Sequence, residues 1–148
     1  MRNVLKLIAA FLFFCITSVS CAVKDITEDN TRTGDSTPDF ILGKWEAVSV
    51  TVCYFNDSGE ALGCDRPFEY GQGRLVLTFK KDGTYYLTQN GSTLLGKYKV
   101  QGNKINRDGS VSELSISGYT MHFIDTGEEQ QQGSLVHWKS TLVLHKIE

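Results

Sequence analysis

The chain has 148 residues, with 15 Lys and Arg against 17 Asp and Glu and a formal net charge of −2. This length, less a leader, fits one domain rather than two. The basic residues are scattered, whereas a nucleic-acid surface needs a basic patch, so we expect no nucleic-acid partner.

Residues 1–20 have the features of an export signal. Arg2 and Lys6 give a basic start, and an apolar run then leads to the small residues before Cys21. The apolar run is shorter than the roughly 20 residues that a membrane-spanning helix requires. We therefore predict a cleaved signal peptide rather than a transmembrane anchor.

The sequence "SVSC" at 18–21 resembles the lipobox of bacterial lipoproteins. The resemblance implies that Cys21 becomes the first mature residue and carries acyl chains such as palmitate. Two or three chains give stable membrane attachment, since each buried methylene contributes about 0.8 kcal/mol. The expected location is the cell envelope, at the outer membrane. The alternative is an ordinary secreted protein, cleaved nearby, in which Cys21 is a stray thiol.

Residues 21–39 follow as a polar stretch rich in Asp, Glu, Thr and Ser. Such a composition cannot bury enough apolar surface to fold, so this segment is predicted to be a flexible tether. From residue 40 to 148 short apolar or alternating runs are separated by glycine turns, which delimits the folded domain.

Eight strands are predicted in this domain, and no sustained helical period occurs. Their expected ranges are 44–55, 74–80, 84–89, 94–100, 104–107, 110–117, 119–125 and 135–147. Most connections have two or three residues, several of them Asp-Gly or Asn-Gly, which favours antiparallel hairpins. The predicted fold is all-β, a single eight-stranded up-and-down barrel.

Alternation along the strands predicts an apolar inner face that is a candidate ligand-binding surface. On the first strand, placing Trp45 inside leaves Val48, Val50 and Val52 outside, so either a bulge changes the phase or the valines pack under another segment. The candidate interior residues are Trp45, Leu75, Leu77, Phe79, Tyr85, Leu87, Tyr98, Val100, Met121, Phe123, Leu142 and Leu144.

Three stretches resemble the lipocalin-like domains of bacterial envelope lipoproteins, which are calycin-type barrels. They are Gly43-Lys44-Trp45, "LTFKKDGTYYL" at 77–87 and "GKYKVQGNKI" at 96–105. The resemblance implies that Trp45 seals the closed end of the barrel, with a late basic residue packed across it. No arginine follows Arg107, so Lys139 or Lys146 is expected in that place. The resemblance also implies binding of a small hydrophobic molecule, although an eight-stranded barrel can equally be filled by side chains.

Cys53 and Cys64 are the cysteines that remain in the domain, and export takes them to an oxidising compartment, so we predict a disulfide. It would stabilise the domain by about 3 kcal/mol in the chain-entropy model. The long loop predicted at 56–73 is then either a lid, with Tyr54, Phe55, Phe68 and Tyr70 as contacts, or a stapled surface loop.

Residue-level signals for catalysis are missing from the sequence. His122, His137 and His145 have no paired metal-ligand spacing, and no nucleophile or phosphate-binding motif occurs. We expect no enzyme activity, no metal and no cofactor. Two functions stay open: a membrane-anchored carrier of a small hydrophobic molecule, or a ligand-free barrel whose loops 56–73 and 126–134 contact another envelope protein, for example as a peptidase inhibitor.

Overall fold

A computed structural model describes residues 37–148; the predicted signal peptide, the Cys21 anchor and most of the tether lie outside the described residues. The described chain is all-β apart from a single 3-10 turn, η1 (Asp39–Ile41). Within it no helix is long and apolar enough to cross a membrane. The strands are β1 (Gly43–Phe55), β2 (Ala61–Cys64), β3 (Phe68–Glu69), β4 (Leu75–Phe79), β5 (Thr84–Gln89), β6 (Ser92–Gln101), β7 (Lys104–Arg107), β8 (Ser110–Ser117), β9 (Thr120–Gln131) and β10 (Ser134–Lys146).

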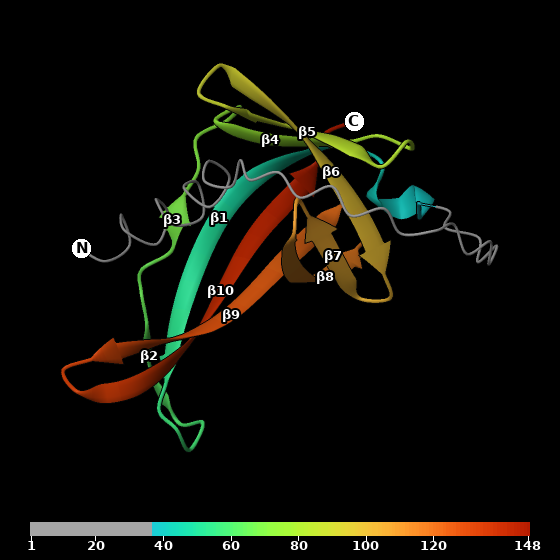
Figure 1. Cartoon of the computed structure of the whole chain (residues 1–148). Helices are drawn as coiled ribbons and strands as arrows, with labels where there is room; N and C mark the ends of the chain where they lie inside the picture. Colours follow the sequence, from blue (N-terminus) through green and yellow to red (C-terminus); the bar gives the residue numbers. More distant parts are fainter. Residues whose placement is uncertain (1–36) are drawn as a thin grey trace, which may run out of the picture. The chain divides into compact units, whose positions relative to one another are not determined.

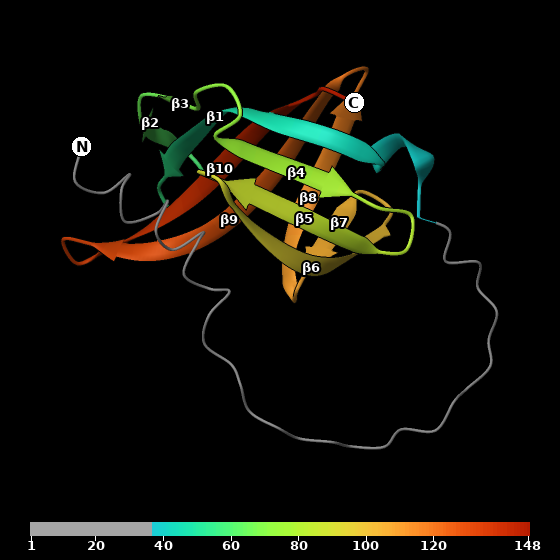
Figure 2. The ribbon, with the colours of Figure 1, turned by 90° about the horizontal axis from the view of Figure 1, so that it is seen from above.

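Eight of these strands close into an antiparallel barrel, as predicted (Figures 1 and 2). The ring runs from β1 through β4 to β10 in order, and β10 returns to pair with β1 along most of its length. Tight turns at positive φ, such as Asn90-Gly91 and Asp108-Gly109, connect neighbouring strands. These dipeptides supply the backbone conformation that two-residue hairpin loops demand.

Two short strands lie outside the ring, in the segment predicted to be one long loop at 56–73. That prediction is wrong for β2 and β3, which both pair with β1. The cause is the edge of β1, because β4 pairs only with its first residues, Gly43 to Glu46. The remaining backbone groups along this edge need partners, and β3 and β2 supply them.

A β-bulge resolves the phase of the first strand. Ala47 lies opposite Leu144 and Ser49 opposite Val143, so Val48 is an extra residue in β1. The Val48 carbonyl accepts a hydrogen bond from the Tyr70 amide at 2.8 Å. After the bulge the inward positions shift by one residue, as bulges require. Trp45 and Ala47 therefore face inward before it and Val52 after it, and all three are buried.

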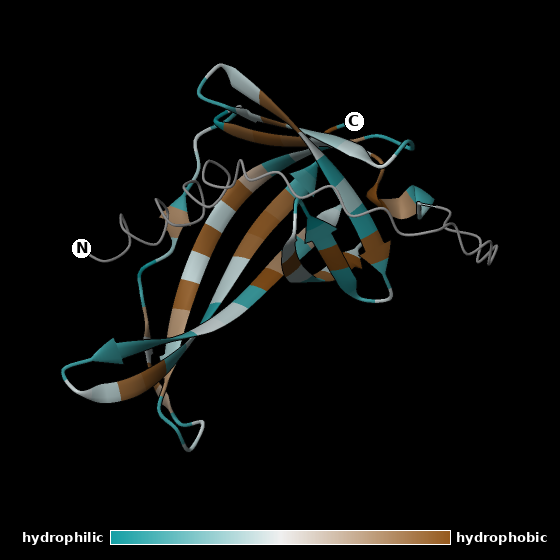
Figure 3. Cartoon of the chain, in the orientation of Figure 1, coloured by the Kyte–Doolittle hydropathy of each residue, from teal (hydrophilic) through white to brown (hydrophobic). Residues whose placement is uncertain are grey.

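The β9–β10 hairpin extends well beyond the barrel, and we call its residues 126–139 the arm. Strand β8 pairs with β9 only as far as Ile124, so the arm has β10 as the sole β9 partner among the described strands. Figure 1 shows the arm projecting at the lower left, and Figure 3 shows its β9 side as hydrophilic. The prediction of a loop at 126–134 is wrong, because residues 126–131 of β9 carry no apolar side chains whose alternation would reveal a strand.

Trp45 lies fully buried at one end of the barrel. Its indole Nε1 donates a hydrogen bond to the Ile41 carbonyl in η1 at 2.7 Å, and Ile41 is itself fully buried. The Lys146 ammonium lies 5.4 Å from the centroid of the Trp45 ring, within range of a cation–π contact. Lys146, rather than Lys139 in the arm, is the basic residue packed across the tryptophan.

Candidate functional site

The closed half of the barrel is a packed apolar core. The Phe79 ring lies at its centre, with centroid distances of 5.9 Å to Tyr85, 4.9 Å to Tyr98 and 6.4 Å to Phe123. Of the twelve residues predicted to face inward, ten are buried in one cluster, and Leu87 and Val100 pack against it partly buried. The structure thus brings the twelve together, mostly in contact with one another. That they bind a ligand stays a prediction.

Four polar side chains face the interior next to this core, and we call them the polar layer: Arg107, Ser112, Asp125 and Ser140. Ser112 and Ser140 are 1% and 2% exposed. Asp125 lies opposite Ser140 across β9 and β10. Sequence reasoning missed this layer because it followed only apolar residues. The signal was the same alternation, which runs from Phe123 to Asp125 and from Leu142 back to Ser140.

Arg107 connects the polar layer to the core. Its Nη2 donates to the Ser112 hydroxyl at 3.1 Å, and its Cζ lies 4.3 Å from the centroid of the Phe123 ring. A guanidinium can stack on an aromatic face while its N–H groups donate hydrogen bonds at its edge. The layer thus presents a fixed positive group above the aromatic core.

Asp125 is the unusual member of the polar layer. Its Oδ2 atom is buried, and no described residue donates a hydrogen bond to it. A buried acceptor without a donor costs about 1–3 kcal/mol, and more when the group is charged. Native proteins rarely leave such an atom alone without an occupying water, ion or ligand.

The pairing around the barrel is incomplete between β6 and β7, beside Arg107 of the polar layer. Strand β7 pairs with β6 only from Tyr98 to Gln101, so the first half of β6 has no strand on its β7 side within the described chain. Leu94, in that first half, has the parity of the inward residue Tyr98 and is 56% exposed. Leu94, on the face of the sheet that carries Tyr98, is therefore accessible at this end of the barrel, which we call the mouth.

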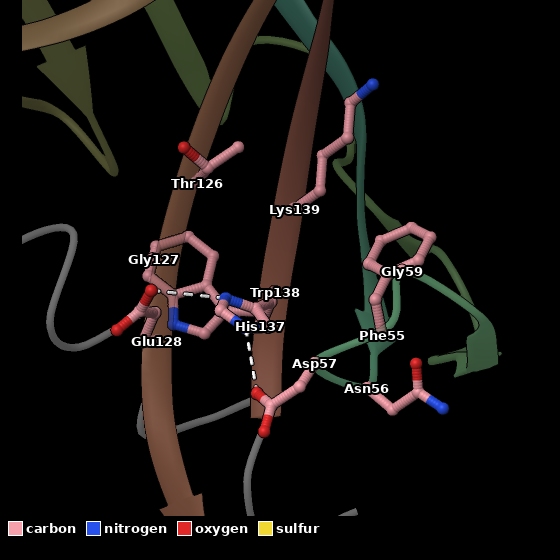
Figure 4. Close-up of a pocket in the computed structure, with 10 residues that line it drawn as sticks. All are labelled: Phe55, Asn56, Asp57, Gly59, Thr126, Gly127, Glu128, His137, Trp138 and Lys139. Carbon is pink, nitrogen blue, oxygen red and sulfur yellow. Dashed lines mark hydrogen bonds and ion pairs between the residues drawn. The ribbon is translucent and has the colours of Figure 1, made fainter. Parts of the chain in front are cut away.

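A second concave feature lies on the arm, outside the barrel interior (Figure 4). It is a hollow of about 350 Å³ lined by Phe55, Asn56, Asp57, Gly59, Thr126, Gly127, Glu128, His137, Trp138 and Lys139. His137 Nε2 lies 3.1 Å from Asp57 Oδ1, and its Nδ1 lies 3.2 Å from Glu128 Oε1. One imidazole therefore joins the turn after β1 to the β9 side of the arm.

The predicted disulfide is confirmed. Cys53 and Cys64 lie opposite each other in the register of β1 and β2 and are bonded. Beside them, the Tyr54 hydroxyl donates to Asp65 Oδ2 at 2.9 Å. Burial, followed by this hydrogen bond and the charges of Asp65 and Glu129, raises the pKa of Tyr54 to about 12. The segment is thus held along β1 by a covalent bond, a side-chain hydrogen bond and strand pairing.

The other predicted lid residues share this edge arrangement. Phe68 packs against Tyr70 at a centroid distance of 5.1 Å, and Tyr70 packs against the barrel core. Burial raises the pKa of Tyr70. Phe55 contributes to the hollow on the arm instead. The aromatic side chains therefore belong to a paired sheet edge and to the arm, rather than to a free loop.

The three histidines lie apart: His122 and His145 on the barrel part of β9 and β10, and His137 in the arm. Within residues 37–148 no group of three or more His, Cys, Asp or Glu side chains is placed to hold a metal ion.

Comparison of the chain with family models, with curated proteins and with solved structures finds no match. The eight-stranded antiparallel barrel is consistent with a calycin-like fold, and such a barrel is compatible with ligand binding.

Proposed function

We propose that this protein is a lipocalin-like envelope lipoprotein whose barrel binds a small, largely hydrophobic molecule at the mouth. The observation that supports this most is the asymmetry of the interior. One end is sealed by Trp45 over a packed core, whereas the other has an inward polar layer and the exposed inward side chain of Leu94. Binding sites of this kind combine apolar walls with a few placed polar groups.

The mouth is a better site than the closed half for an energetic reason. A ligand in the closed half would have to displace side chains such as Phe79 and Leu77, each 1% exposed. Protein cores are packed as densely as organic crystals and resist such insertion. At the mouth a ligand would instead cover Leu94, and burial of apolar area gains about 25 cal/mol per Å².

Titration with the neutral fluorophore N-phenyl-1-naphthylamine tests this proposal. Leu94→Trp should fill the mouth and weaken binding of the probe by at least about tenfold, the effect of 1.4 kcal/mol. Leu95→Trp is the matched control, because Leu95 is the next residue on β6 and faces outward, 66% exposed. Equal affinities for the two variants and the unmodified protein would refute a site at the mouth.

The anchor is a separate part of the proposal and has its own test. Two sequence features support acylation at Cys21: the signal-like start before it and the polar residues that follow it. Cys21→Ala should leave an unprocessed or soluble form when membranes are separated from the soluble fraction. Retention of this variant in the membrane at the level of the unmodified protein would contradict the assignment.

A second candidate function is protein interaction through the arm, and one observation favours it. The hollow on the arm carries the exposed carboxylates of Asp57 and Glu128 beside the aromatic rings of Phe55 and Trp138. A partner surface with basic side chains would complement this face. The double variant Asp57→Asn and Glu128→Gln should then lose partners captured by the unmodified protein from envelope extracts. If every partner were retained, the arm would not be the contact surface.

A further inference from the structure

We propose that the molecule bound at the mouth carries an uncharged hydrogen-bond donor, a hydroxyl or amide N–H, and that this donor binds the carboxylate of Asp125. The inference rests on the proposed function and specifies the chemistry of its ligand. The observation behind it is the buried Asp125 Oδ2 atom, to which no described residue donates a hydrogen bond.

The position of Asp125 follows from the strand register. Phe123, two residues earlier on β9, is fully buried in the core, and Ser140, opposite on β10, is 2% exposed. The last pair in the register between β8 and β9 is Glu113 with Ile124. The next residue on each strand is Ser112 on β8 and Asp125 on β9, so these two lie at the same height in the barrel wall. Asp125 thus faces the interior between the packed core and the mouth.

The neighbours of Asp125 do not complete its hydrogen bonds. The Ser112 hydroxyl accepts a hydrogen bond from Arg107, and no donor among residues 37–148 reaches Oδ2. Strand β1 contributes Val52 opposite Ser140, which has no polar group in its side chain. A donor on a bound molecule would give Oδ2 the partner that the fold leaves out, and hydrogen bonds to a charged group are stronger than neutral ones.

The charges of the polar layer indicate that this donor is neutral. The Arg107 guanidinium and the Asp125 carboxylate face the same interior. Their opposite charges give the polar layer a net charge of zero without a charged ligand. An ammonium group would leave an excess positive charge near Arg107, and a carboxylate would oppose Asp125. An uncompensated charge removed from water costs several kcal/mol. A hydroxyl or amide avoids that cost while still donating a hydrogen bond.

Four probes with the same alkyl chain separate these possibilities in calorimetric titrations of the full protein: 1-decanol, methyl decyl ether, decylamine and decanoate. We expect decanol to bind about 10- to 100-fold more tightly than the ether, because a hydrogen bond to a charged group contributes about 1.5–3 kcal/mol. Decylamine and decanoate should bind more weakly than decanol. The ether measures the contribution of the chain alone.

Asp125→Leu should remove the preference for decanol over the ether while retaining binding of both. Glu113→Leu, an exposed position on the adjacent strand β8, is the matched control and should keep the preference. Circular dichroism of the ligand-free Asp125→Leu variant should show that it retains the β-fold. If that variant does not fold, Asp125→Asn replaces it and should reduce the preference at least threefold.

The failures of the two proposals are distinguishable. If decanol and the ether bind equally to the unmodified protein, the carrier function stands and the inference falls, with a water molecule as the partner of Asp125. Tightest binding of decanoate would also overturn it and point to Arg107 as the contact for the head group. If none of the four probes binds, the site at the mouth and this inference fail together.

Discussion

Replacing Trp45 with Phe tests the claim that this side chain seals the barrel. The substitution keeps an aromatic ring in the core but removes the indole N–H, which donates to the Ile41 carbonyl at 2.7 Å. A buried acceptor left without its donor costs about 1–3 kcal/mol. The smaller ring also weakens the contact with Lys146, worth about 0.5–1 kcal/mol, and leaves a small void.

Together these terms predict a loss of about 2–4 kcal/mol in the free energy of unfolding. Urea denaturation measures it, and with a slope of about 1–3 kcal/mol per M for a small domain the midpoint should fall by at least about 0.7 M. Trp138→Phe is the control, because Trp138 is only partly buried in the arm, and it should cost less than half as much. A Trp45→Phe midpoint within about 0.3 M of the unmodified protein would refute the role of Trp45.

Three further predictions concern the backbone, the disulfide and ionisation. Gly43→Ala should destabilise the domain more than Gly59→Ala in the same denaturation assay. Both glycines have positive φ, so both substitutions strain the backbone. A Cβ at Gly43 would also collide with the backbone carbonyl of Glu148, whereas a Cβ at Gly59 would meet no atom within 4 Å. Replacing Cys53 and Cys64 together with Ala should lower the free energy of unfolding by about 2–4 kcal/mol, and an unchanged midpoint would show that the bridge does not stabilise the fold. Because the pKa of Tyr54 rises to about 12, ultraviolet titration should find at least one tyrosine ionising near that pH, and stability should fall as the pH rises from about 10 to 12. Ionisation of every tyrosine near pH 10 would contradict this assignment.

The barrel could be predicted from local signals because its hairpins have recognisable turn sequences and alternating strands. Turns such as Asn90-Gly91 and Asp108-Gly109 need positive φ, and the inward residues between them alternate with polar ones. The disulfide followed from two cysteines in the domain and a predicted export signal. Lys146 over Trp45 followed from the resemblance, which required a late basic residue.

The features that sequence reasoning missed depend on long-range pairing. Strands β2 and β3 have little strand-like pattern of their own and form because the edge of β1 is left open by β4. The arm is polar on β9 and depends on its pairing with β10. In the sequence Asp125 is the polar last residue of a mostly apolar strand. Only the register between β8 and β9 shows that its side chain faces the interior.

Native mass spectrometry of the purified protein, before and after denaturing solvent extraction, tests the central claim most directly. Mass that survives extraction reports covalent acyl chains on Cys21, whereas mass that disappears reports a molecule held in the barrel. We predict a small, largely apolar compound with a hydroxyl or amide group in the second fraction. A protein whose mass is the same before and after extraction would contradict the carrier function and favour interaction through the arm.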